Sequence, residues 1–101
     1  MRPITHGDVV AVARRLLDLP VAGHKAAVAA FLDRAEAADR FRKRHGRAHP
    51  FWGNGSLMAV ALSGAPPRGE PHLSDPVYLQ AIATVIEGIL DRRKRATLTR
   101  S

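Results

Sequence analysis

The sequence predicts an all-α protein, a single small domain (1–101) in which four helices of unequal length pack as a bundle. Apolar residues recur at spacings of three and four over most of the chain, the pattern of amphipathic helices, and no stretch reads as a strand. Only 5% of the residues are aromatic, so the core must consist mainly of Ala, Val, Leu and Ile, which suits closely packed helices. A chain of 101 residues supports one domain with one modest core.

The first helix is predicted at about 6–18. Thr5 is a capping residue at its start, and Asp8 stands three residues later, where a capping box places an acid. Apolar residues then follow at helical spacing until Pro20, which disfavours helix at the residue before it.

The second and longest helix is predicted at about 21–45. Ala, Leu, Glu, Lys and Arg dominate this stretch, so its helix propensity is high, and Gly46 supplies a C-terminal stop. Its last turn is almost wholly cationic. The predicted core-facing stripe consists of Val28, Phe31, Leu32, Ala35, Ala38 and Phe41. We interpret the acids Asp33, Glu36 and Asp39 as solvated surface charges.

A sharp turn and a short helix follow. Gly53 and Gly55 allow the backbone to turn steeply, and Asn54 or Ser56 can cap the helix predicted at about 55–62. That helix contains no charged residue, which predicts burial on most of its sides.

The fourth helix is predicted at about 76–94, after a loop rich in proline and glycine. Asp75 and Pro76 form a strong start signal, a capping residue followed by proline at the first helical position. The predicted core stripe consists of Leu79, Ile82, Ala83, Val85, Ile86, Ile89 and Leu90. Residues 95–101 are predicted to fray as a basic tail.

The chain carries a formal net charge of +7, from 16 Lys and Arg against 9 Asp and Glu. Many of the cations fall in two clusters, and no acid interrupts either one. The first comprises Arg40, Arg42, Lys43, Arg44 and Arg47, and the second Arg92, Arg93, Lys94, Arg95 and Arg100. Such blocks favour polyanions: nucleic acid, acidic proteins or anionic lipid. The alternative is that they only complement the negative ends of helix macrodipoles and keep the protein in solution.

The loop GRAHPFWGNG, between the second and third predicted helices, is the most distinctive segment. Arg47 and His49 lie beside the first basic cluster, and the start of the third helix offers backbone N–H groups to an anion. Trp52 can stack there on a base or against an arginine. The alternative, which we favour, is that Phe51 and Trp52 close the bottom of a core that is poor in aromatic residues.

No motif for catalysis or for a cofactor is present. His45 and His49 are four residues apart, but Gly46 and Pro50 oppose a continuous helix, and the loop offers no cysteine or carboxylate to complete a zinc site. Ser56 lies in GSLMA, which is not a nucleophile elbow, and GNGS matches neither the phosphate-binding loop nor the dinucleotide fingerprint. We expect a protein that is not an enzyme and needs no cofactor.

The composition also bears on the compartment. The chain has no cysteine, which suits a reducing cytoplasm. The N-terminal stretch is too charged for a signal peptide, and no stretch approaches the roughly 18 apolar residues of a membrane span. We expect a cytoplasmic protein with no membrane partner.

A helix-turn-helix is the obvious DNA-binding module to test. The helix after the turn should begin with polar, base-reading residues, but here it begins VAGHKAAVAA, where only His24 and Lys25 can reach a base edge. The basic residues lie at its far end instead. Nucleic-acid binding is therefore expected through the ends of the second and fourth helices, by contact with the sugar–phosphate backbone and with strong salt dependence.

Nearly the whole chain resembles a family of small, all-helical alphaproteobacterial proteins that carry a similar GRAHP-x-WGNGSLM segment. The resemblance rests on HGDVVAVARRLL, RAHPFWGNGSLMAVAL and DPVYLQAIATVIEGIL, and it brings no catalytic residues with it. It also extends to regulators of gene transfer agents, the phage-like particles that some of these bacteria make. That association implies a role in gene expression or particle production.

Two hypotheses follow. The first is a small regulatory or accessory protein that binds nucleic acid through backbone contacts, and the second is an adaptor that docks an acidic protein, with the Phe51–Trp52 loop as its anchor. Both use the same predicted binding residues, namely Arg40, Arg42, Lys43, Arg44, Arg47, His49, Trp52, Arg92, Arg93, Lys94 and Arg95. Both require helical packing to bring the two basic clusters onto one exposed side.

Overall fold

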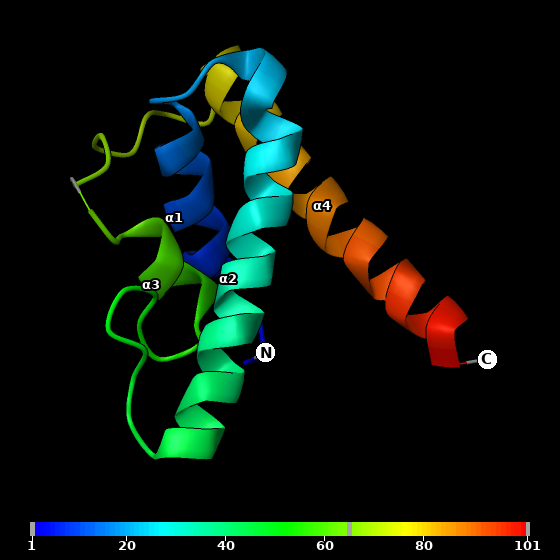
Figure 1. Ribbon diagram of the computed structural model, residues 1–101. Coiled ribbons are helices and arrows are strands. Elements are labelled where there is room, and N and C mark those ends of the chain that lie inside the picture. Colours follow the sequence, from blue (N-terminus) through cyan, green and yellow to red (C-terminus); the bar gives the residue numbers. More distant parts are fainter. Residues whose placement is uncertain (1, 65, 101) are drawn as a thin grey trace.

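The computed structural model describes residues 2–64 and 66–100, with side chains through Thr97, and these residues form four α-helices and no strand (Figure 1). The helices are α1 (His6–Leu16), α2 (His24–His45), α3 (Leu57–Ala61) and α4 (Pro76–Arg100), and a 3₁₀ turn, η1 (Val21–Gly23), precedes α2. The predicted all-α bundle of unequal helices is confirmed.

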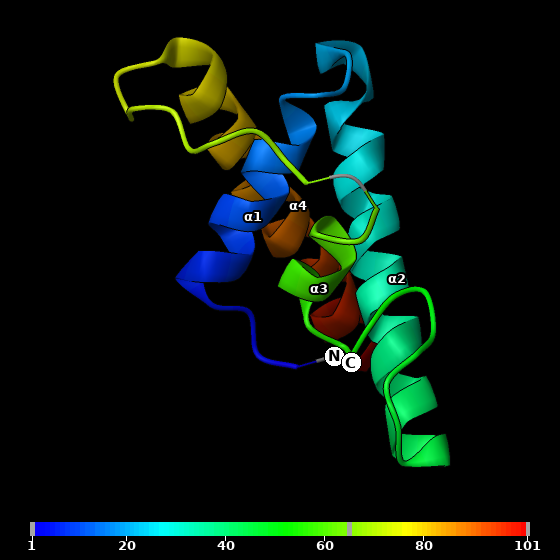
Figure 2. The same cartoon turned by 90° about the vertical axis from the view of Figure 1, so that its left-hand side faces the viewer.

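The two long helices form the frame of the molecule. α2 and α4 run in the same direction, cross where the N-terminal half of α2 meets the middle of α4, and then diverge (Figures 1 and 2). α1 and α3 lie on one side of this pair, where α1 packs against α3 and α4, and α2 packs against α3 and α4 (Figure 2). The basic C-terminal ends of α2 and α4 therefore point toward the same end of the molecule but away from each other (Figure 1). The expectation that packing brings the two basic clusters together on one exposed side is thus not met, and each cluster must be considered separately.

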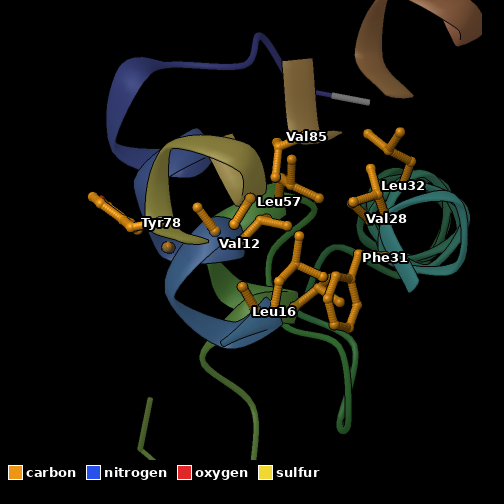
Figure 3. Close-up of a cluster of buried hydrophobic side chains, with 14 residues drawn as sticks. Val12, Leu16, Val28, Phe31, Leu32, Leu57, Tyr78 and Val85 are labelled. Carbon is orange, nitrogen blue, oxygen red and sulfur yellow. The ribbon is translucent and has the colours of Figure 1, made fainter. Parts of the chain in front are cut away.

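The core receives side chains from all four helices. Its larger members are Val12, Leu16, Val28, Phe31, Leu32, Leu57, Tyr78 and Val85 (Figure 3), and alanines of each helix fill the space between them. The predicted stripe of α2 is confirmed, since its residues from Val28 to Ala38 are buried and Phe41 is half-buried. Leu57, Val60 and Ala61 of α3 are buried as predicted.

The predicted core face of α4 is confirmed only in part. Val85 is buried, and Ile82 and Ile89 pack against the core, as predicted. Leu79, Ile86 and Leu90 are instead 46%, 45% and 50% exposed, and Tyr78 and Ala81, which were not predicted, are buried. The crossing with α2 explains why the three residues are exposed. A Cβ on Gly88 would lie 2.5 Å from Val28 Cγ1, so Gly88 must face α2. Helical geometry then places Leu79, Ile86 and Leu90 on the opposite side of α4.

Hydrogen bonds at the helix starts explain where the elements begin. The predicted capping box of α1 is confirmed: Asp8 N–H donates to Thr5 Oγ1 (3.4 Å), and Thr5 N–H donates to Asp8 Oδ2 (2.8 Å). The other oxygen of Asp8 accepts from Met58 N–H (2.9 Å), so a buried carboxylate joins the starts of α1 and α3. Ser56 caps α3 by accepting from Ala59 N–H (3.1 Å).

The boundaries depart from the prediction by a few residues at most ends. α1 stops at Leu16, because a tighter turn begins there, and α2 is regular α-helix only from His24. α3 is shorter than predicted at both ends. α4 continues to Arg100, so the predicted frayed tail is helical up to that residue, and Ser101 lies outside the described residues. The prediction that the second helix is the longest is wrong, because α4 has 25 residues and α2 has 22.

None of the helices in the described part of the chain combines the length and the apolar character that crossing a membrane requires.

Candidate functional site

The C-terminal end of α2 and the loop after it form the candidate site, which we call the α2-end surface: Arg40, Lys43, Arg44, Arg47 and Phe51. α2 ends as predicted at Gly46, which adopts the left-handed conformation (φ 70°) and donates its N–H to Arg42 O (2.8 Å). The chain then turns back along α2 toward α3 (Figure 1). The site thus projects beyond the core at the C-terminal end of α2.

A tight turn shapes the loop. His49 and Gly53 exchange two backbone hydrogen bonds (2.8 and 3.1 Å), which close the turn around Pro50, Phe51 and Trp52. Gly53 has φ +78°, and a Cβ there would lie 2.8 Å from Ala59 Cβ, so only glycine fits without displacing α3. The turn therefore packs closely against α3.

His49 organises the aromatic residues of this turn. Its Nδ1 accepts from the backbone N–H groups of Phe51 and Trp52 (both 3.1 Å), and its ring stacks on Trp52 at 4.6 Å between centroids. Trp52 also packs against the core, as we expected for a residue that closes it. The same expectation is wrong for Phe51, whose ring is 76% exposed. The two neighbours thus face opposite environments.

Asp39 is buried where the loop packs against α2. Lys43 Nζ (3.1 Å) and Arg42 Nη2 (3.5 Å) lie next to its carboxylate. The hydrogen bond from Lys43 holds the pKa of Asp39 at about 2, below its ordinary value of 3.8. Gly55 (φ +98°) passes so close that a Cβ would lie 2.8 Å from Asp39 Cα and Cβ. The interpretation of Asp39 as a solvated charge is therefore wrong.

Arg92 of the second cluster joins α4 to α2. It is half-buried, and it donates to Asp33 Oδ1 (2.8 Å) and to Glu36 Oε2. The hydrogen bond from Arg92 lowers the pKa of Glu36. Burial opposes the charged form of Arg92, but the two carboxylates outweigh it and raise the pKa of the guanidinium. Asp33 is thus a surface charge as predicted, 70% exposed, but it also pairs with Arg92, and Glu36 is paired and more buried. Arg92 is a structural clamp.

The remaining predicted cations differ in their surroundings. Arg40 lies 3.9 Å from Glu36, within ion-pair distance but largely exposed. Among the described residues, no carboxylate lies within ion-pair distance of Arg44 or Arg47, and both are exposed. Arg93 and Lys94 are likewise exposed. Arg95 is exposed and also engaged with another group.

The two clusters differ most in their acidic neighbours. The chain has no Asp or Glu from residue 40 to residue 69, a stretch that covers the α2-end surface and all of α3. Around the α4 cluster, Glu87 and Asp91 share the helix, and Asp33 and Glu36 reach across from α2. The loop after α2 therefore adds no acid to the α2 end, where Glu36 and Asp39 of the helix itself are the acids that pair with Arg40, Arg42 and Lys43.

Two features of the site were missed from the sequence. Exposure of Phe51 depends on the direction of one turn, which spacing cannot give. The ion pairs of Glu36 with Arg40 and of Asp39 with Lys43 could have been predicted, because an acid three or four residues before a cation lies on the same face of a helix. For metals, the described residues contain no group of three or more His, Cys, Asp or Glu able to hold an ion.

Comparison with known proteins places the chain in a family. Residues 2–89 match the model of a family described as Domain of unknown function (DUF7742), and the chain belongs to that family. The match includes α1, α2, α3 and the first half of α4, and with them the whole α2-end surface. Searches of curated proteins and of solved structures gave no significant match.

Proposed function

We propose that the protein binds nucleic acid through the α2-end surface, by contacts to the sugar–phosphate backbone that read little sequence. The observation that supports this most is the acid-free stretch from residue 40 to residue 69, on which Arg44 and Arg47 are exposed with no carboxylate partner among the described residues. Exposed cations of this kind attract phosphate and release counterions on binding. Arg93 and Lys94 on α4 supply a second, weaker contact.

The other predicted binding residues have different tasks. Arg42 and Lys43 are drawn toward buried Asp39, and Arg92 is held by Asp33 and Glu36, so they add less to the attraction of a polyanion. His49 and Trp52 build the turn rather than contact the partner. The proposal therefore concentrates the binding energy on fewer residues than the sequence predicted.

A salt titration tests the proposal. Binding to a duplex of arbitrary sequence, followed by fluorescence anisotropy, should weaken steeply with salt, with a log–log slope of about −0.9 per phosphate contact. We expect a slope of roughly −2 to −4, since two to four cations are available. The absence of binding to any nucleic acid at low salt would end the proposal.

The biological setting belongs to the proposal as well. The resemblance to alphaproteobacterial proteins and to gene transfer agent regulators favours a small regulatory or accessory protein that acts in gene expression. A chain without cysteine suits a cytoplasmic location. No enzymatic step is part of this proposal.

A protein partner is the second candidate. The observation that favours it is the row of exposed apolar side chains on α4, Leu79, Ile86 and Leu90, which is typical of a contact surface for another protein. Affinity capture with and without nuclease treatment separates the two. A partner that survives nuclease supports the adaptor, whereas recovery of nucleic acid that nuclease removes supports the first candidate.

A further inference from the structure

Phe51 has an exposure that the fold does not require. Its side chain is 76% exposed, more than any other large hydrophobic residue in the described part of the chain. The adjacent Trp52 is turned inward, so the loop separates two aromatic neighbours and presents one of them to solvent. Exposing a phenylalanine costs free energy unless a partner covers the ring.

The ring is carried on a fixed support. Phe51 N–H and Trp52 N–H both donate to His49 Nδ1 (3.1 Å each), and the His49–Gly53 hydrogen bonds close the turn around them. Pro50 precedes Phe51 and restricts the backbone further. Little backbone conformational entropy remains to be lost when a flat partner stacks on the ring.

Phe51 also continues an aromatic row that leads to the cations of α2. The His49 ring lies 5.9 Å from Phe51 and 4.9 Å from Phe41, and Phe41 lies 4.3 Å from His45. A shallow hollow beside this row is lined by Ala37, Arg40, Phe41, Arg44 and His45. Aromatic faces and arginines thus alternate along the α2 end.

We infer that the α2-end surface prefers single-stranded nucleic acid, with a base stacked on Phe51 and the adjoining phosphates on Arg40, Arg44 and Arg47. This inference rests on the proposed function and names its substrate class. An unpaired base has a free face for the ring, whereas in a duplex both faces of each base are already stacked. Stacking of this kind tolerates any base, so little sequence preference is expected.

The experiment compares the affinities of a short labelled dT oligomer and of a duplex of the same length, at one low salt concentration. The wild-type chain should bind the dT oligomer more tightly than the duplex. Phe51→Ala should weaken dT binding about tenfold and duplex binding less than twofold. Phe51→Tyr keeps a flat ring and should restore dT binding, whereas Phe51→Leu keeps only apolar bulk and should not.

Leu73→Ala is the matched control, since Leu73 is also a highly exposed apolar residue but lies in the loop before α4, and it should change neither affinity. If Phe51→Ala leaves dT binding unchanged, or weakens both ligands equally, the inference is overturned while the proposed function stands. If the wild-type chain binds neither ligand, the proposed function itself falls. Circular dichroism of each variant confirms that the helices are retained.

Discussion

The two basic helix ends look equivalent in the sequence and differ in the structure. At the end of α4, Arg92 is occupied by Asp33 and Glu36, and two further acids lie nearby on the same helix. At the end of α2, the acids come before the cluster, and beyond Asp39 the chain offers no carboxylate until Glu70. Each end therefore uses some of its cations inside the fold: Arg92 joins α4 to α2, whereas Asp39 and Glu36 pair with cations within α2. What distinguishes the α2 end is the acid-free loop that follows it, which carries exposed Arg47 next to exposed Arg44.

The difference shows what a count of charges leaves out. A cation is available only if no acid reaches it, from one helical turn away or from another element. Both kinds of pairing occur in this protein. Asp39 pairs with Lys43 within α2, and Asp33 pairs with Arg92 of α4, which is 59 residues away in the sequence. The experiments below test each part of this contrast, from the largest expected effect on stability to the smallest.

The largest effect should come from the crossing that brings α4 to α2. Gly88→Leu places a side chain where Val28 Cγ1 already lies, and we expect the free energy of unfolding to fall by about 3 kcal/mol. Urea denaturation followed by circular dichroism measures it. Gly23→Leu is the control, because nothing lies within 4 Å of a Cβ at Gly23, and its effect should be below about 1 kcal/mol. Equal effects of the two substitutions would contradict the close crossing.

The next effect concerns buried Asp39 and is seen in the pH dependence. The pKa of Asp39 is lowered from 3.8 to about 2 in the folded protein, so its carboxylate stabilises the fold above about pH 4, and this contribution is lost as the pH falls toward 2. The wild-type chain should therefore lose more stability between pH 4 and pH 2 than Asp39→Asn does. If the stability of the two proteins depends on pH in the same way, the Asp39 carboxylate does not stabilise the fold as described.

A smaller effect is expected at the clamp. Arg92→Met should lower the free energy of unfolding by about 1 kcal/mol, because Asp33 and Glu36 lose their shared cation while the partly exposed site limits the loss. Arg93→Met, one residue along and exposed, should change it by less than about 0.5 kcal/mol. Thermal and urea unfolding of the two variants give the comparison. Similar values for both would mean that Arg92 is no clamp.

Much of this fold could be predicted from local signals. Thr5 with Asp8, Ser56, Gly46 and Gly53 act through neighbours a few residues away, so their roles were visible in the sequence. The core face of α4 was predicted only in part, because α4 is apolar on two adjoining sides and the choice between them depends on how closely Gly88 approaches Val28.

The site divides in the same way. Its cations and its loop could be located from the sequence, since both follow from composition and turn residues. The sequence could not predict which cations stay unpaired, because Arg92 contacts Asp33 and Glu36 only after α4 has packed on α2. Exposure of Phe51 rather than Trp52 likewise depends on the hydrogen bonds to His49, which form only in the folded turn.

The most direct test of the contrast removes two cations from each end and compares nucleic-acid affinity. Arg44→Ala with Arg47→Ala and Arg93→Ala with Lys94→Ala each lower the formal net charge from +7 to +5, so any difference reflects position alone. Measured by anisotropy at one low salt concentration, the α2 pair should weaken binding about tenfold and reduce the salt slope by about 1.5, and the α4 pair should weaken it about twofold. Equal losses from the two pairs, or a greater loss from the α4 pair, would contradict the assignment of the α2 end as the binding surface.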